Sequence, residues 1–107
     1  MTDARALRKE AFDHFVNDRL DEAVDGYRRA VEIDPELAIA WNGLAMALAQ
    51  QGDLDGAIQA AKRLLELEPD DPLGHTSLSM FYQRKGMIAE AEEERAAALR
   101  LGMRADD

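Results

Sequence analysis

The 107-residue sequence has no cysteine, few aromatic residues and far fewer basic than acidic side chains. Without cysteine, the chain cannot form disulfides or bind a metal through thiolates. Aromatic residues make up only 6% of the chain, so alanine must fill many positions between helices, which predicts close helix packing and modest stability. The 22 acidic and 13 basic residues give a net charge of −9. This charge argues against a nucleic-acid partner, because phosphate contacts require a basic surface.

The sequence also lacks apolar runs of the length that membranes require. Its N-terminus has no uninterrupted apolar core, so no signal peptide is visible. No segment is apolar over the roughly 20 residues that span a bilayer. We therefore expect a cytoplasmic protein without membrane contact, forming one domain over residues 1–107.

Motifs of catalysis and cofactor binding are missing as well. No phosphate-binding glycine loop, Ser/His/Asp set or HExxH motif appears. The only two histidines, His14 and His75, occupy helical packing positions, where we expect partly buried structural side chains. Two aspartate pairs, at positions 53 and 55 and at 70 and 71, lack the glycine and terminal glutamate of an EF-hand, so caps and turns explain them better. The sequence thus predicts no enzyme activity, no metal and no cofactor.

What the sequence does contain is a pair of amphipathic helices, clearest between residues 38 and 69. Trp41, Leu44 and Leu48 recur at helical spacing and therefore share one face. The Gly52-Asp53 pair then interrupts the pattern, since glycine tolerates the left-handed backbone that ends a helix and aspartate caps the next one. A second apolar stripe follows and stops before a proline, which disfavours helical geometry in the residue preceding it.

This helix pair recurs with a period of 34 residues, set by Pro35 and Pro69. Small residues recur where helices must approach closely, and large apolar residues recur where they interlock. Positions aligned by the shift are Leu7, Trp41 and His75; Ala11, Ala45 and Ser79; Leu20, Leu54 and Ile88; Ala23, Ala57 and Ala91; and, in the turns, Asp18, Gly52 and Gly86.

The aligned residues resemble the signature of the tetratricopeptide repeat (TPR) family, W-x2-L-G-x2-Y followed by Ala, an aromatic residue, Ala and Pro. The resemblance covers roughly residues 4–105. The third repeat departs from it by placing Met103 where the proline would fall. Matching residues are Ala23, Tyr27, Ala30 and Pro35 in the first repeat, Trp41, Leu44, Ala57 and Pro69 in the second, and Leu78, Tyr82, Gly86 and Ala91 in the third.

The resemblance implies an all-α, right-handed α-solenoid of six antiparallel helices in three helix-turn-helix repeats, at about 4–37, 38–71 and 72–105. We expect helices at about 4–17, 20–33, 72–85 and 88–101, with two more between 38 and 69. Glu92 and Arg95 replace Val24 and Tyr27 of the first repeat, and polar side chains there suit a terminal repeat that faces water. We therefore expect a complete three-repeat protein capped by its own last helix. A fragment of a longer array is the alternative.

In this family the first helix of each repeat lines a concave groove that holds an extended peptide or a partner helix. The resemblance therefore implies a non-enzymatic protein-interaction module. The implied groove residues are apolar, polar or basic and none is acidic, which predicts a partner segment with an apolar centre and acidic flanks. They are Arg5, Arg8, Phe12 and Phe15 in the first repeat, Ile39, Asn42, Met46 and Gln50 in the second, and Leu73, Thr76, Met80, Gln83 and Arg84 in the third.

Two other functions follow from the same resemblance. The first is structural self-association, in which the groove or an end repeat packs on another copy of the chain. The second is a carboxylate clamp of the kind that binds the C-termini of chaperones, and the sequence disfavours it. Equal offsets place the clamp positions on Arg8, Phe12, Gly43, Leu73 and Ser77, of which only Arg8 is suitable.

Overall fold

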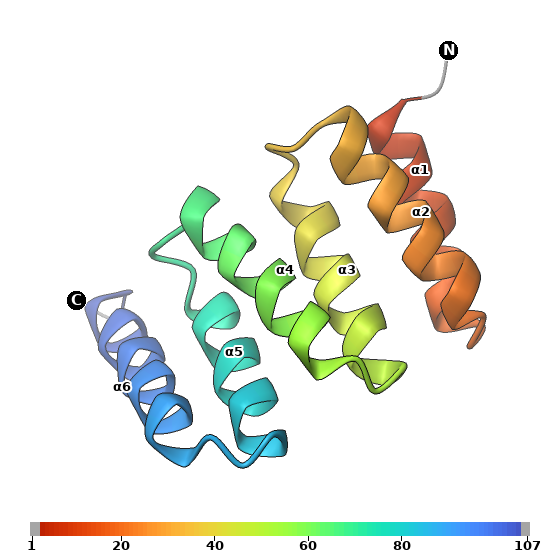
Figure 1. The fold of residues 1–107 in the computed structure, drawn as a ribbon. Helices are drawn as coiled ribbons and strands as arrows, with labels where there is room; N and C mark the ends of the chain where they lie inside the picture. Colours follow the sequence, from red (N-terminus) through yellow and green to blue (C-terminus); the bar gives the residue numbers. More distant parts are fainter. Residues whose placement is uncertain (1–2, 106–107) are drawn as a thin grey trace.

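The computed structural model describes residues 3–105, which form six α-helices and no strand within that range. Consecutive helices pack as pairs, α1 with α2, α3 with α4 and α5 with α6, and each second helix also packs on the first helix of the next pair. Figure 1 shows α2, α4 and α6 in one layer and α1, α3 and α5 in the other. The all-α solenoid predicted from the sequence is confirmed. The helices are α1 (Ala4–Val16), α2 (Leu20–Ile33), α3 (Ala38–Gln50), α4 (Leu54–Leu67), α5 (Pro72–Arg84) and α6 (Ile88–Ala105).

Aspartate side chains cap the helices where the sequence predicted caps and turns. Asp53 accepts a hydrogen bond from the backbone N–H of Gly56 at 2.9 Å, at the start of α4. Asp71 accepts one from the N–H of Leu73 at 2.9 Å, at the start of α5. Each bond satisfies a donor that the helix itself leaves unpaired. These aspartates are therefore parts of the fold.

The turn inside each repeat contains one residue with a left-handed backbone. In the second and third repeats this residue is glycine, Gly52 with φ 89° and Gly86 with φ 81°. In the first repeat it is Asp18, with φ 60°. Aspartate visits this region more readily than most residues with a Cβ atom, because its short polar side chain bonds locally. The three aligned positions therefore make equivalent turns.

The last helix is longer than the sequence indicated. We expected it to end near Leu101, but α6 continues through Gly102 to Ala105. Glycine ends a helix only when it takes up the left-handed conformation, and Gly102 does not. The residues after it, Met, Arg and Ala, favour helix, and no proline interrupts them. The first and fifth helices end one residue earlier than expected, within the usual uncertainty of helix termini.

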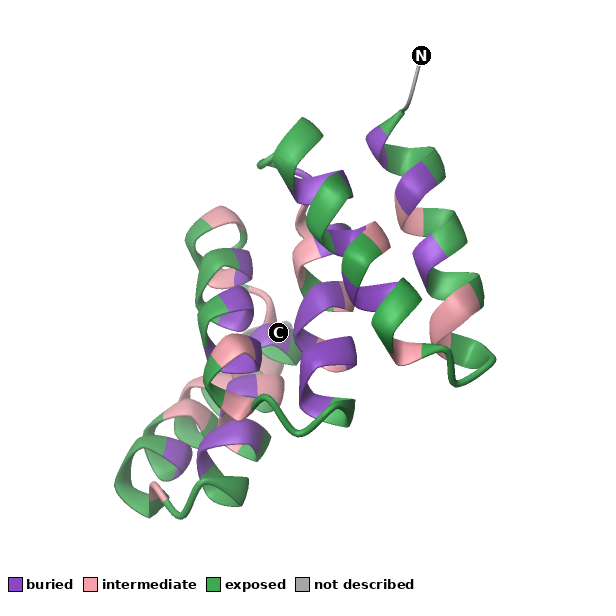
Figure 2. Ribbon diagram, turned by 45° about the vertical axis from the view of Figure 1, so that its right-hand side comes forward, coloured by how far each residue is buried: buried purple, intermediate pink, exposed green. Residues whose placement is uncertain are grey.

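Apolar side chains from all six helices form the core, and alanine supplies many of the closest contacts. Ala11, Ala23, Ala30, Ala40 and Ala57 are completely inaccessible to solvent. Figure 2 shows the buried positions concentrated where helices face one another, with exposed positions outside. Among the described residues, no polar or charged side chain is fully buried. Within residues 3–105, no helix combines the length and apolarity that a membrane crossing requires.

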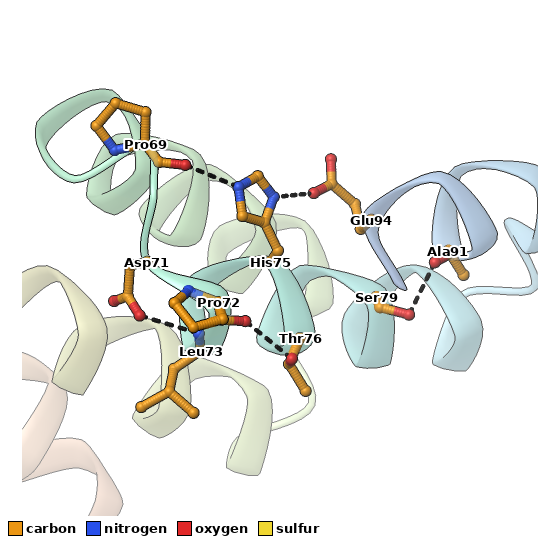
Figure 3. A network of polar contacts seen from close by, with 9 residues as sticks. All are labelled: Pro69, Asp71, Pro72, Leu73, His75, Thr76, Ser79, Ala91 and Glu94. Carbon is orange, nitrogen blue, oxygen red and sulfur yellow. Dashed lines mark hydrogen bonds and ion pairs between the residues drawn. The ribbon is translucent and has the colours of Figure 1, made fainter. Parts of the chain in front are cut away.

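A polar network at His75 joins the last two repeats, and Figure 3 shows it. His75 is partly buried, as predicted, with Nδ1 2.7 Å from a carboxylate oxygen of Glu94 on α6 and Nε2 2.9 Å from the carbonyl oxygen of Pro69. One repeat earlier, Trp41 Nε1 donates to the carbonyl of Pro35 at 2.8 Å. A carboxylate and a carbonyl oxygen are both hydrogen-bond acceptors, so both contacts are satisfied together when both ring nitrogens of His75 carry protons. This arrangement therefore favours the charged imidazolium.

The pKa of His75 follows from the same contacts. Partial burial of the ring lowers the pKa, but the hydrogen bonds to Glu94 and Pro69 and the negative charges of Glu94 and Asp71 outweigh this effect. The pKa of folded His75 is therefore raised above its ordinary value. A raised pKa means that the charged ring stabilises the fold at low pH. This contribution is fully present below the unfolded pKa of about 6.5 and is lost as the pH rises through the folded pKa.

The charged form of His75 stabilises the fold more at about pH 6 than at about pH 8. We therefore expect Glu94→Gln to reduce this difference in the free energy of unfolding by about 1 kcal/mol, since the glutamine cannot pair with the imidazolium charge. Urea unfolding of both proteins at about pH 6 and about pH 8 checks this. His14→Gln is the matched control, because it removes the other histidine and leaves the network intact. An equal change between the two pH values in wild type and Glu94→Gln would contradict the prediction.

Candidate functional site

The first helices of the repeats expose large apolar side chains on a shared surface. Helix α3 contacts α1, and the side chain of Arg84 on α5 donates a hydrogen bond to the carbonyl of Ala49 on α3 at 3.4 Å. Such exposed side chains, when they gather on one surface, indicate an interaction site more often than scattered ones do. On the first helices they are Phe12, Val16, Ile39, Leu73 and Met80, exposed by 48%, 58%, 51%, 73% and 44%.

A hollow of about 200 Å³ lies between α1, α2 and α3 on this surface. It brings together six of the groove residues that the sequence predicted and adds two that pack behind them. Phe12, Phe15, Ile39 and Met46 make most of the wall apolar, while Arg8 and Asn42 supply polar groups. The full lining is Arg8, Phe12, Phe15, Tyr27, Ile39, Asn42, Gly43 and Met46.

Tyr27 reaches this hollow from α2, because Gly43 leaves space for its ring. A Cβ atom on Gly43 would lie 2.2 Å from Tyr27 Cε1 and 2.8 Å from the hydroxyl oxygen, far inside contact distance. Burial raises the pKa of the Tyr27 hydroxyl, and the positive charge of Arg8 offsets part of that rise. The hollow therefore combines an apolar wall with a positive charge, and its lining contains no carboxylate.

A second hollow, also about 200 Å³, lies where α3 meets the end of α4 and the start of α5. It brings together Ile39, Asn42 and Leu73, three of the groove residues named from the sequence. Its lining also includes the carboxylates of Glu68 and Asp71, which the mapping of the first helices did not contain. The groove therefore becomes acidic beside the start of α5, in contrast to the first hollow.

The other predicted groove residues lie on the surface outside both hollows. Gln50 and Gln83 are exposed, and so is Arg5 in the first turns of α1. Thr76 is exposed, and its hydroxyl donates to the carbonyl of Pro72 at 2.9 Å, within α5. Arg84 is anchored at the end of α3 by the hydrogen bond described above. The structure thus assembles the first part of the predicted site closely and leaves the third repeat's polar residues on an open face.

Sequence reasoning missed Tyr27 as a wall of the site, although the signal was present. Tyr27 stands at the position of α2 that packs on the next repeat, and the residue opposite it in α3 is a glycine. A large ring facing a residue without a side chain must extend across it. Pairing these two positions would have placed the ring beneath the groove.

Two hollows of about 350 Å³ lie outside the groove. One lies between α1 and α2 and is lined by four carboxylates, from Glu10, Asp21, Glu22 and Asp25. Within residues 3–105, no group of three His, Asp or Glu side chains is placed to hold a metal ion. The other hollow of this size lies between α2, α3 and α4 and is lined in part by Trp41, Leu44 and Leu48. Leu44 and Leu48 are only 5% and 3% exposed, so they are already packed in the core and offer little surface to a partner. The groove is the candidate site because its apolar side chains are exposed.

The fold and the groove define a helical-repeat protein of the class that mediates protein interactions. The sequence profile of the tetratricopeptide repeat family matches residues 4–72, more than half of the chain, and the protein belongs to that family. The third repeat lies outside the matched range, yet it folds as the same helix pair. A search of curated protein sequences gave no significant match.

Solved structures with the same fold include two of MamA. One has a TM-score of 0.95 at 25% identity and covers 98% of this chain and 61% of the MamA chain. The other has a TM-score of 0.90 at 26% identity and covers 94% and 55%. This chain therefore spans about three fifths of the length of those MamA chains.

A third structure is the second TPR of Spaghetti (RPAP3) bound to the HSP90 peptide SRMEEVD. Its TM-score is 0.88 at 17% identity, over 94% of this chain and 93% of that one. At this identity the likeness shows a common fold alone.

Proposed function

We propose that this chain is a non-enzymatic interaction module that binds a peptide or a helix of a partner protein in the groove formed by α1, α3 and α5. The observation that carries the proposal is the apolar hollow beside Arg8, with exposed apolar side chains continuing from it along α3 and α5. The RPAP3 structure, bound to an HSP90 peptide, lends support by analogy, because it shares this fold. Most of the binding energy would come from desolvated apolar contacts in the hollow.

We further propose that the partner segment is apolar at its centre and acidic where it passes the basic residues. Acidic flanks would lie near Arg5 and Arg8 at one side and near Arg84 at another. Near Glu68 and Asp71 an acidic flank would be repelled, so the segment should be neutral or basic there. Because these charges lie at the rim, they would set orientation and association rate more than affinity.

We expect Met46→Glu to reduce partner binding at least about tenfold, because it places a charge against the apolar wall of the hollow. Phe12→Glu should have a similar effect and tests the same surface at a more exposed residue. Gln59→Glu on α4 is the matched control, since it adds the same charge at an exposed position away from the groove. Capture of partners from native lysate, compared among the folded variants, measures the effect. Normal binding by both groove variants would show that another surface is used.

The charge preference needs a separate experiment with defined peptides. An array with one apolar centre and acidic, neutral or basic flanks should show the strongest binding for acidic flanks. Arg84→Glu should weaken that binding moderately, and the effect should shrink at high salt because exposed charges are screened. Equal binding of acidic and basic flanks would contradict the proposed partner chemistry.

A further inference from the structure

Helix α6 carries an exposed, partly apolar stripe that faces away from α5. Ile88, Glu92, Arg95, Leu99 and Met103 follow one another at spacings of four, three, four and four residues, which places them on one side of an α-helix. The apolar members are exposed by 56% at Ile88, 59% at Leu99 and 69% at Met103. Glu92 and Arg95 face water, as predicted for a terminal repeat, but they are flanked by this apolar surface.

In α2 and α4, the positions equivalent to this stripe form the contact with the next repeat. In α2, Val24 and Tyr27 occupy these positions, and both are buried, Tyr27 against Gly43 of α3. In α4, the side chain of Leu65 lies against Gly74 of α5. The stripe of α6 is therefore the position that would bind a further helix, and no helix of the described chain covers it.

We infer that this stripe binds the same stripe of a second copy, with the two α6 helices antiparallel about a two-fold axis. From Ile88 to Leu99 the spacing of four, three and four reads the same in both directions. An axis midway between Glu92 and Arg95 therefore places Ile88 opposite Leu99 of the partner subunit. It also places Glu92 opposite Arg95 of the partner subunit and Arg95 opposite Glu92 of the partner subunit. Such a self-complementary patch is what a two-fold dimer requires.

The charges favour this pairing over a head-to-tail stack. Within one chain, a guanidinium nitrogen of Arg95 lies 3.6 Å from a carboxylate oxygen of Glu92, and both side chains are mostly exposed. In the dimer, this ion pair within each chain would be replaced by two ion pairs between the chains. A head-to-tail stack would instead need an apolar face on α1. There Glu10 and His14 occupy the positions that Leu44 and Leu48 fill in α3, so α1 offers charged or polar side chains.

The proposed interface is separate from the groove and is small. One pair of helices buries less surface than a permanent dimer usually does, so the association should be weak and should depend on concentration. It does not rest on the groove proposal, because none of the five stripe residues lines either groove hollow.

Charge reversal tests the pairing directly. Glu92→Arg gives two cations on each stripe and Arg95→Glu gives two anions, so each variant alone should dimerise at least about tenfold more weakly than wild type. When the two variants are mixed, every cation of one meets an anion of the other, and dimerisation should return as a heterodimer. Sedimentation velocity from micromolar to millimolar concentration, with one variant fluorescently labelled, measures both effects. Circular dichroism confirms that each variant is folded.

Three outcomes would overturn the inference. Wild-type protein that stays monomeric over the whole range would show that the stripe does not bind a second copy. Dimers that both single variants leave unchanged would lie on another surface. Variants that weaken dimerisation but fail to recover on mixing would show that the two charges do not face each other across the axis.

Discussion

Replacing Leu44 with aspartate should unfold the protein at room temperature. Leu44 is only 5% exposed and lies in the core where α3 packs against the neighbouring helices. Removing the leucine side chain costs about 2–5 kcal/mol in lost burial and cavity formation. Placing a carboxylate there without a partner adds to this loss. A small domain with about 5–15 kcal/mol of total stability, and with few aromatic anchors, falls below the threshold for folding.

A matched substitution separates burial from the change in chemistry. Leu73→Asp makes the same replacement at a side chain that is 73% exposed in the first turn of α5, where a negative charge also suits the helix N-terminus. We expect this control to retain its helical circular dichroism and cooperative melting, whereas Leu44→Asp should lose both. A folded Leu44→Asp variant would show that the helix packing described here is wrong.

Gly43→Ala should lower the melting temperature by roughly 5–15 °C, although alanine favours helix more than glycine does. The added methyl group would lie 2.2 Å from the ring of Tyr27, and that ring is buried between α2 and α3. The ring must shift, and overpacking of this kind costs about 1–3 kcal/mol, more than the gain in helix propensity. The first two repeats should separate more easily as a result.

Gly102→Ala is the control for this prediction, because a Cβ atom at Gly102 meets nothing within 4 Å. Since the substitution causes no clash, the melting temperature should stay the same or rise. The reason is that alanine adds up to about 1 kcal/mol of helix stability relative to glycine. Thermal unfolding of both variants gives the comparison. If the two substitutions shifted the melting temperature in the same direction, the contact between Gly43 and Tyr27 would not be the cause.

The helices and their pairing could be predicted from the sequence because their signals are local. The spacing of apolar residues predicted which face of each helix is buried. Gly52 indicated a turn, Asp53 indicated a helix N-cap, and Pro69 indicated the end of a helix. The end of α6 was predicted wrongly, because the effect of Gly102 depends on its backbone conformation and not on its identity alone. Local rules fail where the same residue permits two conformations.

The site was only partly predictable, because a groove is made by elements that are distant in sequence. Residues on the first helices followed from the resemblance, and Phe12, Asn42 and Met46 do share one hollow. Glu68 and Tyr27 belong to second helices or to the connection after them, so a mapping of first helices alone could not include them. Their side chains enter the groove only because of how the repeats stack.

The position of Tyr27 links occupancy of the site to the cohesion of the solenoid. Its ring is both the contact between the first two repeats and a wall of the hollow that we propose as the anchor. Fraying of the first repeat would remove Arg8, Phe12 and Phe15 from the hollow and leave the tyrosine without its cover. By linkage, a ligand that fills the hollow must suppress this fraying in proportion to its affinity. Hydrogen exchange of the α1 and α2 amides would then slow on binding, even at amides that do not touch the ligand. The first repeat would be the part of the solenoid whose local stability depends most on the bound ligand.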